Sequence, residues 1–301
     1  MSERKYSHVI VIVVDGAGAF FKDADTPNFD KLFKDGAVTY RAISSRPTIS
    51  AECYGSMLLG VDPAIHGLTN SKVDEKPYPL DSKFPSLFRR IRNAYPDAEL
   101  GSYCQWDPIT RGIVESDAGV SNESAHDTAM TPIICDYIKE KKPDFLFVQM
   151  DSVDGVGHSK GYGTEAHLHR IHEVDALIND IHDAAVDAGI IDDTLFVVLA
   201  DHGGEGYSHG GWSDTERFVT FAVKGKGVEK GEIEEINIRD LAAMVLYVFD
   251  IEAPEFDEEG WTAQIPHGIW KETDALEYRD ISHLTGAPAR ISKVAHTSEL
   301  V

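Results

Sequence analysis

The sequence predicts an α/β fold with a mainly parallel central sheet and helices on both faces. Short apolar runs alternate along the chain with longer segments of helical periodicity, the order in which crossover helices join parallel strands. The short runs are apolar throughout rather than at every second residue, as expected of strands buried on both faces. At 301 residues the chain fits one large domain, residues 1–301, with a Pro-, Lys- and Asp-rich excursion at about 71–86.

The first predicted elements are a strand and a helix near the start of the chain. Val9–Val14 is a β-branched run followed by Asp15-Gly16, which is typical of a buried strand. Thr26 and Pro27 suit the N-cap and first position of a helix that ends at Gly36. The pattern then predicts a helix at Ser50–Gly60 and a strand at Leu100–Trp106.

The second half of the chain alternates helices and strands at closer spacing. Apolar side chains recur at helical intervals in three segments, Asp127–Lys141, His167–Gly189 and Asp240–Phe249. Three apolar runs predict buried strands, at Phe145–Met150, Thr194–Ala200 and Phe218–Val223. The tail after Glu272 has no strong pattern.

Acidic residues dominate the charge of the chain. The 51 Asp and Glu residues against 28 Lys and Arg residues give a formal net charge of −23. This excess argues against binding to a nucleic-acid polymer, for which a basic stripe is expected. It does not exclude a small anionic substrate, because bound cations can reverse the electrostatic field inside one pocket.

The sequence carries no signal for a membrane or for disulfide bonds. No apolar run approaches the roughly 20 residues that span a bilayer, and Asp15 interrupts the first run before it could serve as a signal sequence. The three cysteines, Cys53, Cys104 and Cys135, are odd in number and form no CxxC pair. We therefore expect a cytoplasmic protein with reduced thiols.

Three predicted strands end in side chains of the kind that bind metals. The first ends at Asp15, another leads into Asp154 and His158, and a third ends in Asp201-His202. Ligands of open parallel sheets bind at the carboxyl ends of the strands, so we expect these side chains to meet. Carboxylate together with imidazole favours zinc, manganese or iron over magnesium alone. The glycines between Asp154 and His158 predict a loop there rather than one helical face.

The role of one histidine stays open at the level of the residues alone. His209 follows His202 by seven residues, in Ser-His-Gly-Gly-Trp, and is either a metal ligand or an exposed turn residue. Ser50 lies where a helix begins, and the free backbone N–H groups there favour an alkoxide and a bound phosphate. His66 is expected in a turn, where it would position its neighbours.

Six motifs follow one another along the chain: Asp15-Gly, Thr26-Pro-Asn-Phe-Asp-Lys-Leu, Pro47-Thr-Ile-Ser50, Gly60-Val-Asp-Pro-Ala-Ile-His66-Gly, Asp154-x-x-Gly-His158 and Asp201-His202-Gly. In this order they resemble the alkaline phosphatase superfamily, and most closely its nucleotide pyrophosphatase/phosphodiesterase branch. The resemblance runs from about residue 8 to residue 260. It implies an alkaline phosphatase-like fold.

The resemblance also implies two divalent ions, with zinc as the expected metal and manganese or iron as alternatives. One ion would be bound by the nucleophile and by Asp15, Asp201 and His202. The second would be bound by Asp154, His158 and a histidine that precedes the next strand, a position that His209 matches.

The resemblance implies a Thr or Ser nucleophile just before a helix, and Thr48 and Ser50 compete for this role. Counting back from Gly60 places Ser50 rather than Thr48 at the position of the family's nucleophile. Asn70 matches the family's asparagine that hydrogen-bonds a phosphoryl oxygen. The stretch Ser50-Ala-Glu-Cys-Tyr lacks the Pro and Arg of the sulfatase signature, which argues against sulfatase chemistry.

The expected reaction is metal-dependent hydrolysis of phosphodiester or pyrophosphate-type bonds in a small phosphorylated substrate, through a phosphoseryl intermediate. Three aspartates against two divalent ions leave the site neutral once Ser50 ionises, so a diester monoanion needs no further cation. A monoester dianion would favour an extra cation, for which the candidates are Lys72, Lys76, Lys83 and Arg46. A phosphomonoesterase or phosphonate hydrolase is the alternative, and a non-catalytic metal-binding protein is a remote one.

Overall fold

One eight-stranded sheet forms the centre of the protein within residues 4–233, 235–255 and 260–276, which the computed structural model describes. Its strands are His8–Val14 (β1), Ala37–Ile43 (β2), Leu100–Cys104 (β3), Ser121–Glu123 (β4), Phe145–Met150 (β5), Thr194–Leu199 (β6), Phe218–Lys224 (β7) and Gly231–Glu232 (β8). Their order across the sheet is β4-β3-β5-β1-β6-β7-β2-β8.

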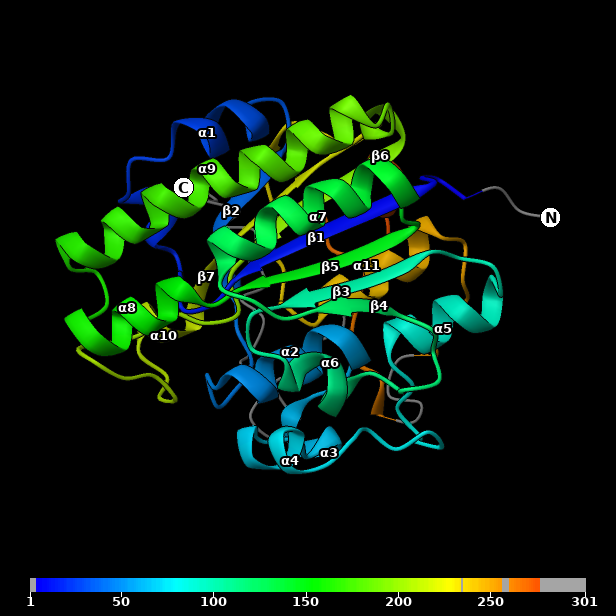
Figure 1. Cartoon of the computed structure of the whole chain (residues 1–301), viewed down its shortest axis with the longest axis horizontal. Helices are drawn as coiled ribbons and strands as arrows, with labels where there is room; N and C mark the ends of the chain where they lie inside the picture. Colours follow the sequence, from blue (N-terminus) through cyan, green and yellow to red (C-terminus); the bar gives the residue numbers. More distant parts are fainter. Residues whose placement is uncertain (1–3, 234, 256–259, 277–301) are drawn as a thin grey trace, which may run out of the picture.

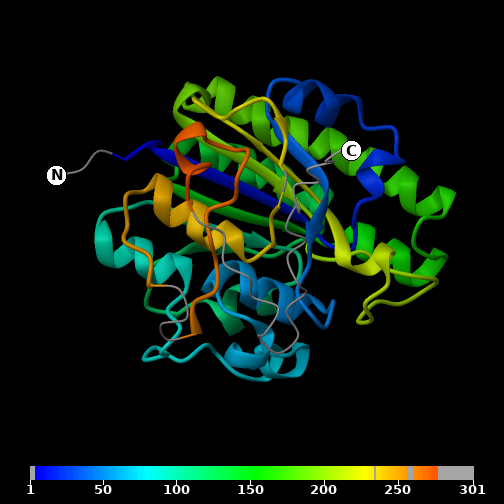
Figure 2. The ribbon, with the colours of Figure 1, turned by 180° about the vertical axis from the view of Figure 1, so that it is seen from behind.

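Helices cover both faces of this sheet (Figure 1). They span Pro27–Phe33 (α1), Ser50–Leu59 (α2), Pro63–His66 (α3), Asn70–Glu75 (α4), Leu87–Ala94 (α5), Pro108–Ile113 (α6), Asp127–Lys141 (α7), Ser152–Lys160 (α8), Glu165–Asp187 (α9), Asp214–Arg217 (α10) and Asp240–Val248 (α11). On one face, α1, α7 and α8 all pack against α9. On the other face, α11 packs against α2 and α5, as the view from behind shows (Figure 2). The prediction of an α/β fold with helices on both faces is confirmed.

The central strand β1 pairs in parallel with β5 on one side and β6 on the other. The side chains of residues 9–14 are inaccessible to solvent. Their β-branched side chains favour an extended backbone and pack well on a surface that helices cover on both sides. The three strands therefore end side by side at one edge of the sheet, which is where Asp15 emerges.

The strand β7 departs from the parallel arrangement, because it runs antiparallel to both of its neighbours, β6 and β2. The connection from β6 to β7, residues 200–217, contains the short helix α10 and no crossover helix. It therefore stays at the edge where β6 ends, and β7 starts there and runs back. As a result His209, which lies in this connection, remains at the carboxyl edge of the parallel strands.

The segment 71–86, predicted to be an exposed excursion, is exposed at most of its residues but is anchored at a few. Most of α4 lies within it, and the side chains of Val73, Tyr78 and Phe84 are buried. The sequence pattern also does not predict β2, because this strand is partly exposed along its length and lacks a continuous apolar run.

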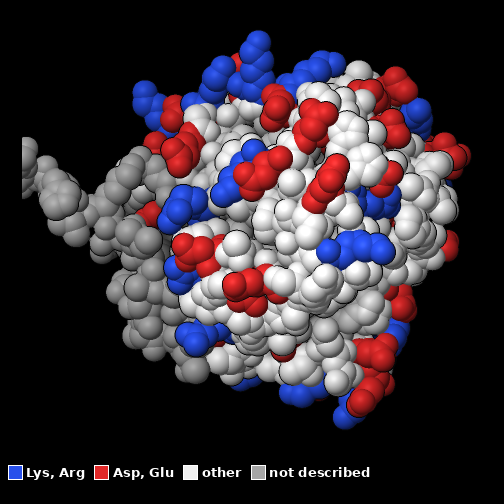
Figure 3. Space-filling view, turned by 90° about the vertical axis from the view of Figure 1, so that its left-hand side faces the viewer, with Lys and Arg blue, Asp and Glu red and all other residues white. Residues whose placement is uncertain are grey.

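Acidic and basic side chains are interspersed over the surface that Figure 3 shows. Because charges of both signs lie close together there, the surface creates no strong field of one sign on that side. No helix among the described residues is long and apolar enough to cross a membrane.

Candidate active site

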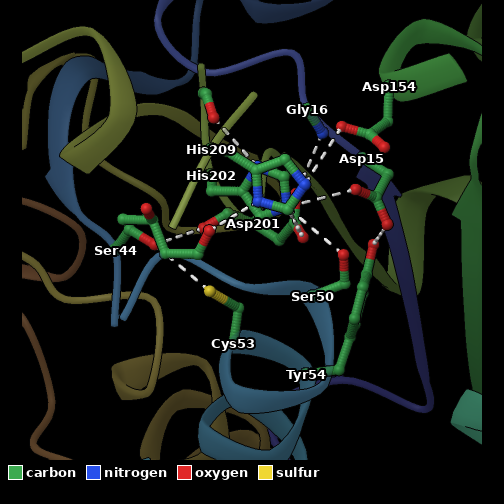
Figure 4. A network of polar contacts seen from close by, with 12 residues as sticks. Asp15, Gly16, Ser44, Ser50, Cys53, Tyr54, Asp154, Asp201, His202 and His209 are labelled. Carbon is green, nitrogen blue, oxygen red and sulfur yellow. Dashed lines mark hydrogen bonds and ion pairs between the residues drawn. The ribbon is translucent and has the colours of Figure 1, made fainter. Parts of the chain in front are cut away.

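Three strand ends and one helix start deliver the candidate site residues to one place (Figure 4). Asp15 follows β1, Asp201 and His202 follow β6, and Asp154 lies near the start of α8, which follows β5. Ser50 is the first residue of α2, and its Oγ lies 3.3 Å from His202 Nε2. All of these residues except Asp154 are at least nine-tenths buried.

Asp154 and His158 lie one turn apart on the helix α8, which corrects the predicted loop. The helix begins there because Asp127, at the start of α7, accepts hydrogen bonds from the main-chain N–H groups of Asp151 (3.0 Å) and Ser152 (3.1 Å) and from the Ser152 hydroxyl. Such an acceptor satisfies donors that a helix N-terminus leaves without partners. The cap comes from a distant part of the chain, so local glycine content misleads here.

Three histidines present the same ring nitrogen to the site. His158, His202 and His209 each donate Nδ1–H to a main-chain carbonyl, at 3.0 Å to Tyr207 O, 3.0 Å to Gly203 O and 2.7 Å to Thr48 O. In the neutral ring this bond leaves Nε2 as the nitrogen that can bind a metal, as is usual for metal-ligating histidines.

Two aspartates each leave one carboxylate oxygen without a hydrogen-bond donor. Asp15 Oδ2 accepts from Tyr54 Oη and Gln149 Nε2, both at 3.0 Å, and Asp201 Oδ1 accepts from Gly16 N at 3.1 Å. The other oxygens, Asp15 Oδ1 and Asp201 Oδ2, are buried and accept no hydrogen bond. They lie 3.5 Å and 3.2 Å from His202 Nε2. Buried carboxylate oxygens without donors are costly, and a cation would satisfy them.

The ligand atoms fall into two overlapping groups in which all atoms lie within 4.8 Å of one another. One group is Asp154, His158 and His209, and the other is Asp15, Asp154 and His202. The first group is the set that the resemblance implies for one ion. The second contains Asp154 in addition to two of the residues expected for the other ion, so Asp154 belongs to both. The donor chemistry of both groups fits divalent ions such as zinc.

The pKa values of these residues reflect burial first and the charges of their neighbours second. Burial, followed by the charges of Asp201 and Asp154, raises the pKa of Asp15 well above its usual range. Burial likewise raises the pKa of Asp201 to about 7. For Asp154 burial acts in the same direction, but the hydrogen bond with His158 and the charge of His202 lower its pKa overall. The Asp154 hydrogen bond raises the pKa of His158 to about 9. A cluster that attracts positive charge this strongly is suited to cations.

Thr48 and Ser50 have different surroundings. Thr48 is fully buried, and its Oγ1 donates to Gly211 O and accepts from Gly210 N, both at 3.0 Å. Its hydroxyl is therefore used to hold the loop that carries His209. The Ser50 hydroxyl faces His202 Nε2 instead. Asn70 Oδ1 accepts from Ala51 N at 3.0 Å, so this side chain lies at the start of α2, beside Ser50.

His66 and His167 lie close to the site but use their ring nitrogens within the protein. His66 donates Nε2–H to Glu52 O at 3.2 Å and accepts from Leu68 N at 3.0 Å, so it links α2 to the turn after α3. His167 on α9 donates Nε2–H to Gly16 O at 3.3 Å. Both side chains therefore hold main-chain segments beside the site.

Sequence reasoning misses three polar residues that contact the carboxylates. Tyr54 and Gln149 donate to Asp15, and Tyr162 donates to Asp154 Oδ1 at 2.5 Å. Gln149 carries one usable signal, since it is a polar residue in an otherwise apolar buried strand. Tyr54 and Tyr162 carry none, because tyrosines are common in partly apolar segments.

The family of the chain follows from comparison with known proteins. The profile of the family described as "Type I phosphodiesterase / nucleotide pyrophosphatase" matches residues 9–78 and 109–267. The chain belongs to this family. It is therefore a phosphoric ester hydrolase, and the predicted kinship with the alkaline phosphatase superfamily is confirmed. The family is metal-dependent, and the matched segments contain both groups of candidate ligands.

Several solved structures have a fold similar to that of this chain. Inactive murine ectonucleotide pyrophosphatase/phosphodiesterase 5, in complex with AMP, has a TM-score of 0.67 at 15% identity over 82% of this chain and 96% of that chain. A 2-O GAG sulfatase has a TM-score of 0.67 at 13% identity, over 83% and 72%. The lipoteichoic acid synthase LtaP from Listeria monocytogenes has a TM-score of 0.65 at 12% identity, over 88% and 76%. Among curated protein sequences, none matches significantly.

Proposed function

We propose that this family member hydrolyses phosphodiester or pyrophosphate-type bonds, with two divalent cations and Ser50 as the nucleophile. The observation that carries the proposal is that two buried carboxylate oxygens without hydrogen bonds lie close to His202 and Ser50. Asp15 Oδ1 and Asp201 Oδ2 accept no hydrogen bond and approach His202 Nε2, which lies 3.3 Å from Ser50 Oγ. The four atoms come from three separate segments of the chain and have no other shared role in the fold.

The cations would be held by two sets of residues. One set is Asp15, Asp201, His202 and Ser50, and the other is Asp154, His158 and His209, with Asp154 close enough to contribute to both. The mixed nitrogen and oxygen donors favour zinc, with manganese or iron as alternatives. When bound, the cations would supply positive charge that favours the ionised Ser50 hydroxyl and stabilises negative charge on substrate oxygens.

Ser50 performs the covalent step. Its Oγ attacks phosphorus and forms a P–Oγ bond while the bond from phosphorus to the leaving oxygen breaks, and the leaving group departs as an alcohol or phosphate. Water then attacks the phosphoseryl intermediate, the P–Oγ bond breaks and Ser50 is regenerated. Ser50 is the first residue of α2, where the positive end of the helix dipole would favour negative charge on the phosphoryl group.

Asn70 stabilises the phosphoryl oxygens in this proposal. Its Oδ1 accepts from Ala51 N, so the amide is anchored at the residue next to the nucleophile. The amide then has its Nδ2–H groups to donate to a phosphoryl oxygen, where negative charge builds up during transfer.

The contacts of the nearby Lys and Arg side chains favour a diester substrate over a monoester. Of the four candidates for an extra positive charge, Lys72 Nζ donates to Gly67 O at 2.5 Å and the Lys76 side chain is exposed. Lys83 lies over the Phe84 ring, and Arg46 lies over the Trp212 ring. None of these three contacts directs the charge to Ser50. A site of three aspartates and two divalent cations therefore matches a monoanionic diester. The AMP complex of the murine relative supports a nucleotide-type substrate of small size.

The proposal is tested by acid quenching during turnover of a bis-aryl or nucleotide diester. We expect hydrolysis only after zinc or manganese is restored to chelator-treated protein, and a phosphorylated peptide containing Ser50 in the quenched sample. Hydrolysis that persists in fully demetallated protein, or a phosphate found on Thr48, would overturn the proposal. Faster hydrolysis of monoesters would replace the diester reading with that of a phosphomonoesterase.

A further inference from the structure

Tyr162 holds the carboxylate that belongs to both ligand groups. It lies between Gly161 and Gly163, just after α8, and its side chain is buried. The phenol donates to Asp154 Oδ1 at 2.5 Å. The other carboxylate oxygen, Oδ2, lies 3.2 Å from His158 Nε2. One hydrogen bond therefore fixes how the Asp154 carboxylate is turned toward its neighbours.

The ring of Tyr162 is enclosed by two glycines from different segments. A Cβ atom on Gly157 would lie 2.3 Å from Tyr162 Cε1, and one on Gly204 would lie 2.5 Å from Tyr162 Cδ2. Gly157 belongs to α8, which carries Asp154 and His158, and Gly204 follows Asp201-His202. The ring thus touches both ligand-bearing segments, and neither glycine could carry a side chain without displacing it.

The Tyr162 ring also lies among the histidines of one ligand group. Its centroid is 5.7 Å from the ring of His158 and 6.3 Å from the ring of His209, and both pairs are edge-on. The corresponding contact at the other group is made by Tyr54, whose hydroxyl donates to Asp15 Oδ2 at 3.0 Å. Each group therefore has one buried tyrosine hydroxyl on one of its aspartates.

We propose that Tyr162 is a positioning residue that sets the cation affinity of the Asp154–His158–His209 group, and that Tyr54 does the same for the group containing Asp15. This inference rests on the proposed function, because it requires cations at both groups. Hydrogen bonds to metal-binding carboxylates and histidines orient the ligands, and their loss typically lowers metal affinity about 10–100-fold. The phenol donates to the carboxylate without binding the cation, so its effect is exerted through Asp154.

The variants Tyr162→Phe and Tyr54→Phe separate the hydroxyl from the ring. Each retains the aromatic ring that packs against the glycines or in the core, and each removes one hydrogen bond. Binding of Zn²⁺ and Co²⁺ to chelator-treated full-length protein is measured by calorimetry and by the Co²⁺ absorption spectrum. His158→Ala identifies which of the two binding events belongs to the Asp154–His158–His209 group.

For Tyr162→Phe we expect the binding event that His158→Ala removes to weaken about 10–100-fold. The other event should weaken less, because Asp15 and His202 also hold that group. For Tyr54→Phe we expect the reverse. Unchanged affinities in Tyr162→Phe would overturn the inference, since the ring alone would then suffice. An equal loss at both events would also overturn it, because it would indicate general loosening. If either of these results is found while the wild-type protein binds two cations, only the inference about the tyrosines fails and the proposed function stands. If the wild-type protein binds no cation, the proposed function itself is refuted.

Discussion

His209 Nδ1 donates a hydrogen bond to the main-chain oxygen of Thr48 over 2.7 Å. Two residues after Thr48 the chain reaches Ser50, the first residue of α2. The bond therefore ties the loop that carries one candidate metal ligand to the segment that carries the candidate nucleophile. The Thr48 hydroxyl reinforces this link through Gly210 and Gly211.

Ser50→Ala is expected to abolish turnover while leaving most of the bound metal in place. Alanine removes the attacking oxygen, but the aspartate and histidine ligands remain. Thr48→Ala should reduce activity far less, because its hydroxyl holds the loop and faces away from the chemistry. Steady-state kinetics and elemental analysis of both variants check this. An active Ser50→Ala protein beside an inactive Thr48→Ala protein would move the nucleophile to Thr48.

Protein purified without chelator is expected to contain two divalent metal ions per chain, about 4 Å apart as in other two-metal sites. His158→Ala should reduce the content to one, because it removes one of the three ligands of its group. His169→Ala is a matched control, since this histidine lies exposed on α9. Elemental analysis gives the count. A single ion in the wild type, or a loss in His169→Ala, would contradict the arrangement.

A nucleotide or bis-aryl diester is expected to be hydrolysed with a higher kcat/KM than the corresponding monoester at neutral pH. The second negative charge of a monoester lacks a partner in the site, and an unpaired charge in a partly desolvated pocket costs several kcal/mol. At about 1.4 kcal/mol per factor of ten, part of that cost separates the two rates by orders of magnitude. Paired assays with both substrates measure the ratio. If monoesters prove equal or faster, Arg46→Ala and Lys72→Ala should identify the cation responsible.

Two glycines of α8 are expected to respond in opposite ways to alanine. A Cβ on Gly155 meets no atom within 4 Å, so Gly155→Ala should stabilise the helix by about 0.5–1 kcal/mol. A Cβ on Gly157 would collide with the Tyr162 ring, so Gly157→Ala should destabilise the protein by roughly 1–3 kcal/mol. Urea unfolding of both variants provides the comparison. Equal stabilities would mean that the ring moves aside at no cost.

Asp127→Ala is expected to destabilise α8 and to weaken metal binding. The change leaves the main-chain N–H groups of Asp151 and Ser152 without their acceptor, at a cost of about 1–3 kcal/mol each for buried groups. Asp136→Ala on the exposed face of the same helix α7 is the control and should have little effect. Unfolding free energy and metal affinity are measured together. Metal affinity equal to that of wild type would show that α8 forms without this cap.

Much of the site can be predicted from the amino-acid sequence without any tertiary information. Continuous apolar runs predict the buried strands β1 and β6, and parallel strands place Asp15 and Asp201 at a common edge. The boundaries of α2 also follow from local signals, because Gly60 ends the helix with a positive φ of 71°. The strands and the end of α2 depend on interactions between near neighbours in sequence, so local patterns suffice to predict them. The common edge follows from the general rule for parallel sheets.

The tertiary structure alone decided the rest. The helix α8 forms around its two glycines because Asp127, from a different helix, caps its start. His209 reaches the site because β7 runs antiparallel to β6 and keeps the connecting loop at the same edge. Tyr54 and Tyr162 act on the carboxylates through hydrogen bonds whose directions depend on the packed core and on the glycines around one ring. Each of these depends on contacts between distant segments, which form only when the chain is folded, and local sequence preferences carry no information about them.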